Sequence, residues 1–256
     1  MSTLDRFSLK GKTVIITGAS QGIGESVALG MAEAGANLVL AARSVDKLAS
    51  VRKSIEAIGG RSIAVATDVL KRDDVEAMVA AAVAEFGTVD CLVNNAGINI
   101  VKPALNITEQ DWDAVIDTNL KGYFLAAQAA GRVMIAKGGG TIINNASVFG
   151  LRGFHMLAPY IASKGGVVQL TRGLAVEWAR KKVRVNCVAP GYTMTEMTKR
   201  DIESNPAVLE ANLRKIPMNR GAEPREVADV MVFLASDASS YVTGQILAVD
   251  GGWTAF

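Results

Sequence analysis

The chain has 256 residues, half of them apolar and a fifth charged, an ordinary composition for a folded globular protein rather than a disordered one. Its 27 basic and 25 acidic residues leave a formal charge of +2, which gives no electrostatic reason to expect a nucleic-acid or membrane-surface partner. No apolar run approaches the roughly 18 residues of a membrane span, and residues 1–12 lack the apolar core of a signal peptide. We therefore expect a cytoplasmic protein.

Two cysteines and a single histidine offer little for metal or thiol chemistry. A zinc site needs four clustered ligands, whereas Cys91 and Cys187 are far apart in the chain, so no metal is expected. Both cysteines lie in apolar, strand-like runs, which is typical of buried free thiols. His155 is expected at a pocket rim or facing solvent.

Short apolar runs alternate with amphipathic segments along the whole chain. The predicted strands are Thr13–Thr17, Asn37–Ala42, Ser62–Thr67, Cys91–Asn94, Thr141–Asn145, Arg184–Ala189 and Ile246–Val249. The predicted helices are Glu25–Ala34, Asp46–Ile58, Val75–Phe86, Gly122–Ala136, Tyr160–Ala179 and Arg225–Leu234. Because the alternation is unbroken, we predict one α/β domain over residues 1–256, with a parallel sheet and right-handed crossovers.

Residues 192–217 interrupt this alternation, since they contain Pro206, Pro217 and many polar side chains but no strand pattern. Insertions after the carboxyl end of a strand often form binding loops. We interpret the segment as a helical flap over the site, with a solvated surface excursion as the alternative.

A glycine-rich turn joins the first predicted strand to the helix that follows. Residues 18–24 read Gly-Ala-Ser-Gln-Gly-Ile-Gly, so the backbone can approach a pyrophosphate while the helix N-terminus presents free N–H groups. The spacing differs from the commoner Gly-x-Gly-x-x-Gly, but its place between first strand and helix favours dinucleotide binding. An ordinary turn of small residues is the alternative.

The end of the second predicted strand bears on the choice of dinucleotide. An acidic residue at this position binds the ribose 2′-hydroxyl of NAD, whereas arginine suits the 2′-phosphate of NADP. The chain has Ala42, Arg43 and Ser44 there, and a guanidinium can hold a phosphate through paired hydrogen bonds. We therefore expect NADP(H) to be preferred, with NAD(H) possible; the alternative is that Arg43 is a solvated cation.

Three further motifs complete a pattern: Asn94-Asn-Ala-Gly97 follows the fourth strand, Ser147 follows the fifth, and Tyr160-Ile-Ala-Ser-Lys164 comes next. With the glycine turn, and through Pro190-Gly191 and Asp250-Gly-Gly252, the whole chain resembles the short-chain dehydrogenase/reductase family. The resemblance implies a Rossmann-like, doubly wound sheet of seven parallel strands in the order 3-2-1-4-5-6-7. It also implies a homotetramer and hydride exchange between a nicotinamide and a small-molecule alcohol or carbonyl.

The resemblance also implies a role for each catalytic residue. Tyr160 would be the general acid/base, Lys164 its partner and a ribose ligand, Ser147 a donor to the substrate oxygen, and Asn119 the holder of a relay water. Four positions on a helix place Tyr160 and Lys164 on one face, and an ammonium about 4–6 Å away would lower the pKa of the phenol.

The remaining site residues fall into two groups. The cofactor is expected against Gly18, Ser20, Gln21, Gly22, Ile23, Gly24, Arg43, Ser44, Asp68, Val69, Asn95, Ala96, Gly97, Tyr160, Lys164, Pro190, Gly191 and Thr193. Besides Ser147 and Tyr160, the substrate is expected against Asn99, Val148, Phe149, Phe154, Met156, Tyr192, Met194, Met197 and Trp253.

Most of these substrate residues are apolar, which favours a ketone with a sizeable hydrocarbon part. The alternatives are a 3-oxoacyl carrier protein reductase and an NAD-preferring gluconate or polyol dehydrogenase. The former would need two basic carrier contacts, at positions occupied here by Gly138 and Lys181. A non-catalytic nucleotide sensor is the remote alternative.

The predicted helix Gly122–Ala136 is rich in small residues, which allow another helix to pack closely against it. This composition suits a subunit interface or, alternatively, packing within the chain.

Overall fold

Seven parallel strands form one sheet in the computed structural model, which describes residues 2–195, 198 and 206–255. The strand order is β3-β2-β1-β4-β5-β6-β7, which confirms the predicted order. The strands are β1 Thr13–Thr17, β2 Asn37–Ala42, β3 Arg61–Ala66, β4 Cys91–Asn94, β5 Gly140–Asn145, β6 Val183–Pro190 and β7 Ile246–Val249.

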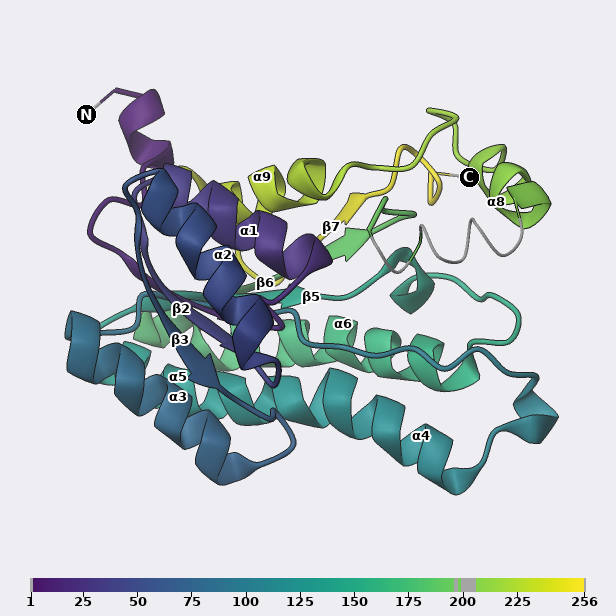
Figure 1. The fold of residues 1–256 in the computed structure, drawn as a ribbon, viewed down its shortest axis with the longest axis horizontal. Helices are drawn as coiled ribbons and strands as arrows, with labels where there is room; N and C mark the ends of the chain where they lie inside the picture. The colour runs from purple at the N-terminus through teal and green to yellow at the C-terminus, as the bar shows by residue number, and fades with distance from the viewer. Residues whose placement is uncertain (1, 196–197, 199–205, 256) are drawn as a thin grey trace.

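Helices cover both faces of this sheet (Figure 1). One layer holds α1 Gly22–Glu33, α2 Val45–Ala57 and α9 Pro224–Ala235. The other holds α3 Arg72–Phe86, α5 Gly122–Lys137 and α6 Ala158–Trp178. Two further helices of the described residues, α4 Glu109–Ile116 and α8 Pro206–Leu213, lie at the end of the molecule where the sheet's strands finish.

Turn chemistry sets several helix ends a few residues away from the predicted ones. Helix α3 begins three residues early because Asp73 and Asp74 favour its first turn, and α6 begins at Ala158 because Pro159 suits an N-terminal position. Helices α3 and α5 end at Gly87 and Gly138, whose φ values of 80° and 95° lie in the left-handed region.

Alternation along the strands divides the core into two apolar layers. On β1, Val14 and Ile16 pack under α1 and α9, whereas Ile15 packs under α3 and α5. Burial on both faces holds for the central strands but fails at the edge, where β3 is only partly buried and exposes Arg61. The edge position explains the difference, since β3 has a neighbouring strand on one side only.

The two cysteines confirm the prediction of free, buried thiols. Strand β5 lies between β4, which carries Cys91, and β6, which carries Cys187. Burial raises the pKa of the Cys91 thiol to about 12 and that of the Cys187 thiol to about 11, so both stay protonated at neutral pH.

The small residues of α5 pack against other parts of the same chain. This agrees with the alternative prediction, packing within the chain, rather than with a subunit interface. A Cβ added at Gly131 would lie 2.9 Å from the Trp178 ring of α6, so the glycine permits close approach of the two helices. The buried small residues in the middle of α5 are Ala126, Ala127, Ala129, Ala130 and Gly131.

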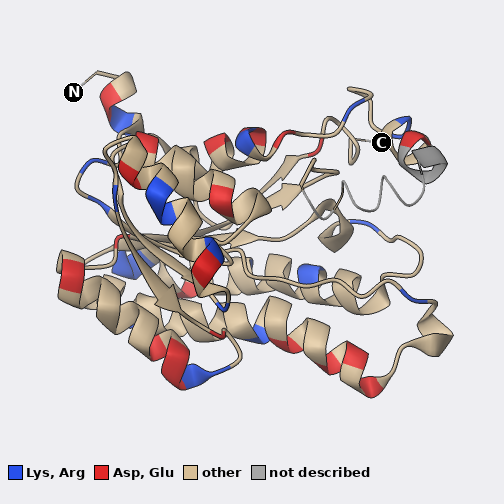
Figure 2. Cartoon of the chain, in the orientation of Figure 1, with Lys and Arg blue, Asp and Glu red and all other residues tan. Residues whose placement is uncertain are grey.

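Figure 2 shows charged residues of both signs along the ribbon, with Lys and Arg interspersed among Asp and Glu on the helices. None of the helices in the described residues is both long enough and apolar enough to cross a bilayer.

Candidate active site

A cleft of about 980 Å³ opens at the carboxyl ends of the strands. Its walls come from the β1–α1 turn, the ends of β2, β4, β5 and β6, the start of α6 and the segment after β6. All the residues predicted to hold a cofactor line it, which places them around a single cavity.

The glycine turn of the cleft leaves no room for side chains. Gly18 and Gly22 have φ values of 66° and 61°, which L side chains rarely adopt. A Cβ added at Gly24 would lie 2.1 Å from the carbonyl oxygen of Gly18 and 2.5 Å from Nδ2 of Asn95. Helix α1 begins at Gly22 with no side-chain cap on its N-terminal N–H groups, so this end of the cleft fits a phosphate.

Asn95 ties this turn to the middle of the sheet. Its Nδ2 donates to the carbonyl oxygens of Thr17 and Gly18 at 3.1 and 3.0 Å, and its Oδ1 accepts from Nδ2 of Asn145 at 2.8 Å. The first and fifth strands thus share one amide network beneath the cleft.

The side chain of Lys47 joins Arg43 and Ser44 at the end of β2. Its Nζ donates to Oε1 of Gln21 at 2.7 Å, and all four residues line the cleft. Sequence reasoning missed Lys47, although its spacing of four from Arg43 at a helix start was a usable signal. Two cations therefore border the part of the cleft where Arg43 was predicted to meet a 2′-phosphate.

The cleft also brings together three predicted catalytic side chains, those of Tyr160, Ser147 and Lys164. A side-chain hydrogen bond joins Tyr160 to Ser147, and Nζ of Lys164 lies 5.6 Å from the centre of the Tyr160 ring. All three line the cleft. The structure therefore brings the predicted phenol, hydroxyl and amine together.

The pKa of Tyr160 differs from the sequence prediction. Burial raises the pKa of the phenol above its ordinary value, and the hydrogen bond with Ser147 lowers it by less. The predicted lowering by Lys164 is therefore not seen in the chain without cofactor. Burial also acts on Lys164 itself and lowers the pKa of its ammonium to about 8.

A second buried phenol, Tyr123 of α5, stands beside Lys164. The amine of Lys164 donates to the carbonyl oxygen of Asn145 at 2.7 Å, and the Tyr123 hydroxyl donates to the same oxygen at 3.1 Å. The amine and the Tyr123 hydroxyl are 3.4 Å apart. Sequence reasoning missed Tyr123 because, in an otherwise apolar helix, it carried no signal beyond a core residue.

Asn119 occupies a π-helical turn, Asp117–Lys121, between α4 and α5. Its side chain is fully buried and exchanges two hydrogen bonds with the backbone of Ile98, at 2.8 and 2.9 Å, and one with Oγ of Ser163 at 3.1 Å. The amide is therefore committed to holding the loop after β4 against α6. Asn119 is not among the residues that line the cleft, and its part in a water relay stays a prediction.

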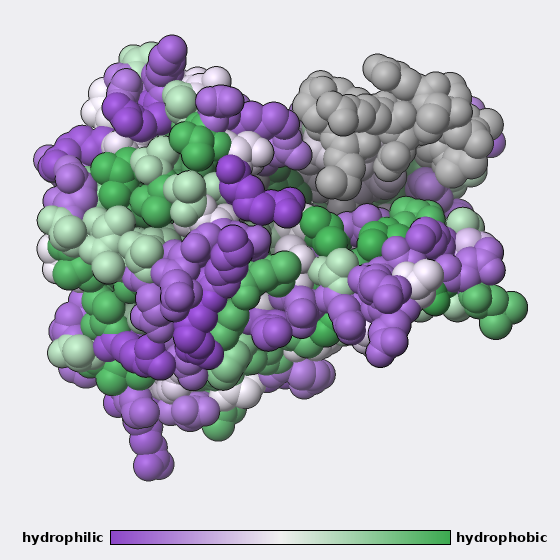
Figure 3. Space-filling view, turned by 60° about the horizontal axis from the view of Figure 1, so that its bottom comes forward, coloured by the Kyte–Doolittle hydropathy of each residue, from purple (hydrophilic) through white to green (hydrophobic). Residues whose placement is uncertain are grey.

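The predicted substrate end of the cleft is aromatic. Phe149 lies 4.7 Å from Phe154 and 5.5 Å from Trp253 between ring centres, and His155 stacks on Phe154 at 4.4 Å, which confirms its place at the rim. Figure 3 shows hydrophobic residues gathered in patches on this face of the molecule. The predicted substrate residues that line the cleft are Asn99, Ser147, Phe149, Phe154, Met156, Tyr160, Tyr192 and Trp253.

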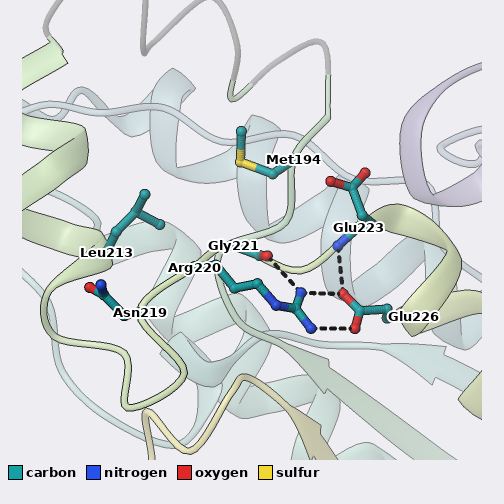
Figure 4. Close-up of a pocket in the computed structure, with 7 residues that line it drawn as sticks. All are labelled: Met194, Leu213, Asn219, Arg220, Gly221, Glu223 and Glu226. Atoms are coloured by element: carbon teal, nitrogen blue, oxygen red, sulfur yellow. Dashed lines mark hydrogen bonds and ion pairs between the residues drawn. The ribbon is translucent and has the colours of Figure 1, made fainter.

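Two of the predicted substrate residues that the structure describes do not line the cleft. Val148 is buried in the core beneath the cleft. Met194 lines a separate hollow of about 550 Å³, together with the ion pair between Arg220 and Glu226 (Figure 4). The chain turns at Thr193, which pairs with Ala222 and so directs Met194 to that hollow. Met197 lies outside the described residues.

The predicted flap borders the cleft wherever the structure describes it. Tyr192, Thr193, Thr195, Thr198 and Asn212 all line the cavity, and the helical part is α8. Residues 196–197 and 199–205 of this prediction lie outside the described residues.

Comparison with known proteins agrees with this geometry. Residues 18–254 match the model of a family described as enoyl-(acyl carrier protein) reductase. The chain is 41% identical to 2-dehydro-3-deoxy-D-gluconate 5-dehydrogenase from Escherichia coli K12, over 98% of this chain and 99% of that protein. It is 42% identical to a 3-oxoacyl-[acyl-carrier-protein] reductase from Thermotoga maritima, over 95% of this chain and 98% of that protein.

Two similar crystal structures contain nicotinamide dinucleotides. One, from Agrobacterium tumefaciens, has bound NADP and is 38% identical, with a TM-score of 0.91 over 98% of this chain and 99% of that one. The other is 7α-hydroxysteroid dehydrogenase with NADH and 7-oxo glycochenodeoxycholic acid, 33% identical with a TM-score of 0.94 over 98% of both chains. By its motifs, its sheet and these matches over nearly its full length, this chain belongs to the short-chain dehydrogenase/reductase family of oxidoreductases.

Proposed function

We propose that this protein is an NADP(H)-dependent oxidoreductase that reduces a small-molecule ketone to a secondary alcohol and catalyses the reverse reaction. The observation that carries the proposal is the convergence of Tyr160, Ser147 and Lys164 on the cleft whose far end holds the glycine turn. Oxidation of NADPH with a panel of ketones tests it. If the protein binds NADPH but reduces no ketone of the panel, the result would favour a non-catalytic nucleotide sensor.

The residues present fit a nicotinamide dinucleotide. The uncapped N-terminus of α1 and the bare backbone at Gly18, Gly22 and Gly24 would hold the pyrophosphate, and Lys164 would donate to the nicotinamide ribose. When bound, the reduced nicotinamide would supply the hydride for the carbonyl carbon. NADP and NADH in the two similar structures support this cofactor class.

In the proposed mechanism the chain manages the proton and the charge on the substrate oxygen. Ser147 and Tyr160 donate hydrogen bonds to the carbonyl oxygen, which stabilises the negative charge that develops there. Tyr160 then gives its proton to that oxygen as general acid and takes it back as general base in alcohol oxidation. Lys164 stabilises the resulting tyrosinate, while Asn119 acts as a positioning residue through Ile98 and Ser163.

The preference for NADP(H) rests on Arg43 and Lys47, two cations that a 2′-phosphate would reach. Arg43→Asp is expected to raise the Kd of NADPH by about 10- to 100-fold, the range of a lost charge-assisted contact, and to change the Kd of NADH little. Lys47→Gln should act in the same direction but less strongly. Calorimetric titration of both dinucleotides measures the effect, with Lys53→Asp, on the exposed surface of α2, as control. Equal Kd values for NADPH in Arg43→Asp and the parent would contradict the assignment.

The buried ammonium of Lys164 is expected to lower the free energy of unfolding of the protein, although the proposed reaction requires it. Burial lowers its pKa from 10.5 to about 8, which costs roughly 3 kcal/mol in the native state below pH 8. Between pH 8 and 10.5 the unfolded chain holds more protons at this site, so the cost fades as pH rises. Lys164→Met is therefore expected to be inactive yet more stable, by about 2 kcal/mol at pH 7 and by less at pH 10. The Tyr123 hydroxyl would still satisfy the carbonyl of Asn145.

Urea unfolding at both pH values measures this difference. Lys53→Met is the control, because an exposed substitution usually changes stability by no more than about 0.5 kcal/mol. A less stable Lys164→Met protein at pH 7 would show that the amine's contacts outweigh its burial.

A carrier-protein or sugar-acid substrate is the second candidate, since two proteins similar to this chain carry such names. The aromatic end of the cleft favours a substrate with an apolar part over a polyol.

We also propose that the protein is a homotetramer. The proposal rests on three exposed apolar side chains on α4, α5 and α6, those of Trp112, Phe124 and Val176. Light scattering that gave the mass of a single chain would refute it.

A further inference from the structure

Two cations flank the aromatic end of the cleft. The guanidinium of Arg152 lies 5.7 Å from the centre of the Trp253 ring and donates to the Trp253 carbonyl oxygen at 2.7 Å. The ammonium of Lys215 lies 5.7 Å from the centre of the Phe154 ring and 3.4 Å from Oδ1 of Asn212. Trp253, Phe154 and Asn212 all line the cleft, so both charges contact its lining residues, although neither cation is itself part of the lining. We call this part of the cleft its mouth.

Neither cation is neutralised by an acidic side chain within the described part of the chain. Arg214, which adjoins Lys215, pairs with Glu210 at 2.5 Å, and Arg220 pairs with Glu226 at 2.6 Å. Arg152 and Lys215 take part in no such pair among the described residues, and the ring of His155 stacks on Phe154. Within the described residues their contacts are ring faces and neutral oxygens, so each of the two charges favours a negative group beside it.

This charge lies outside the reacting centre. The rings of Phe149, Phe154 and Trp253 pack against one another, and all three residues line the same cleft as Ser147 and Tyr160. A substrate that reaches from Tyr160 to the cations must therefore place an apolar segment against the rings and a negative group at the mouth.

We infer that the substrate is an oxo-carboxylate whose carbonyl faces Tyr160, whose hydrocarbon body lies on the Phe149–Phe154–Trp253 surface and whose carboxylate is held by Lys215 and Arg152. The inference rests on the proposed function, which it narrows to one class of carbonyl compound. Lys215 is the main determinant, because Arg152 is already bonded to the Trp253 backbone. Attraction at an exposed mouth acts on binding and on the rate of encounter more than on the chemical step.

The test compares 4-oxocyclohexane carboxylate with its methyl ester, which share the ring and the reacting carbonyl. For the unaltered enzyme we expect kcat/KM for the acid to exceed that for the ester about tenfold, through KM, and the ratio to fall as salt rises. Lys215→Gln should bring the ratio close to one, whereas Lys53→Gln should leave it as it is. A ratio near one in the unaltered enzyme, or a ratio that Lys215→Gln does not change, overturns the inference.

A binding measurement separates this inference from the proposed function. In enzyme saturated with NADP⁺ the ketone cannot be reduced, so calorimetry gives the Kd of acid and ester without turnover. A tenfold tighter Kd for the acid, lost in Lys215→Gln, supports the carboxylate site even if neither compound is reduced, in which case the proposed function alone fails. A preference confined to an oxoacyl thioester of coenzyme A would instead assign the two cations to phosphate and overturn the carboxylate.

Discussion

Tyr160→Phe is expected to lower kcat about 10³-fold in both directions while leaving the Kd of NADPH within about twofold. The substitution removes only the hydroxyl, which is the proposed proton donor, and general acid–base catalysis typically contributes 10²–10⁴-fold. The ring remains to fill its place beside Ser147 and Lys164. Stopped-flow measurement of NADPH oxidation gives the chemical step directly.

The control for this experiment is Tyr241→Phe, which removes a hydroxyl from a fully exposed tyrosine. It should turn over at the parental rate. Parental kcat in Tyr160→Phe would contradict the proton-donor role, and water or another side chain would then have to supply the proton.

Gly24→Ala should have the second large effect, a lower melting temperature together with a Kd of the dinucleotide at least tenfold higher. The new Cβ would meet the backbone oxygen of Gly18 at 2.1 Å and the amide of Asn95 at 2.5 Å, so α1 must move away from the turn. Overpacking of this kind typically costs 1–3 kcal/mol. The displacement would also break the turn that is proposed to carry the pyrophosphate.

Gly30→Ala on the same helix is the matched control. Its added Cβ would meet nothing closer than 3.7 Å, and alanine is the better helix former, so this variant should be as stable as the parent or slightly more so. Thermal unfolding with and without NADP⁺ measures both properties. An unchanged melting temperature and Kd in Gly24→Ala would show that the turn can widen at no cost.

Local patterns in the sequence carried most of the fold. Strands such as Thr13–Thr17 and Cys91–Asn94 were predicted at their observed bounds, because an apolar run between polar turns determines a buried strand by itself. The helix starts moved by a few residues where side chains such as Asp73 and Pro159 extended the first turn. The strand order followed from the family resemblance rather than from these patterns.

The cofactor residues were predictable because they lie in loops at strand ends, which parallel topology brings to one edge of the sheet. Residues that act across elements were not predictable in this way. Tyr123 and Asn145 meet Lys164 only through the packing of α5, β5 and α6, and no spacing along the chain encodes that contact.

Two side chains lie where residue type alone could not have placed them. Asn119, whose relay role stays a prediction, lies in a π-helical turn where its amide bonds Ile98 and Ser163. Met194, whose substrate role also stays a prediction, lines a neighbouring hollow because Thr193 pairs with Ala222. In both cases the backbone path after a motif, rather than the residue type, decided where the side chain lies.

The amide of Asn95 has a consequence for how ligands communicate. It bonds the Gly18 turn on one side and Asn145 on the other, and the backbone oxygen of Asn145 in turn holds the amine of Lys164. Whatever stiffens the turn therefore also restrains that amine. Thermodynamic linkage makes such an influence mutual, so a compound bound at Tyr160 should raise the affinity for the dinucleotide by the same factor as the dinucleotide raises the affinity for the compound.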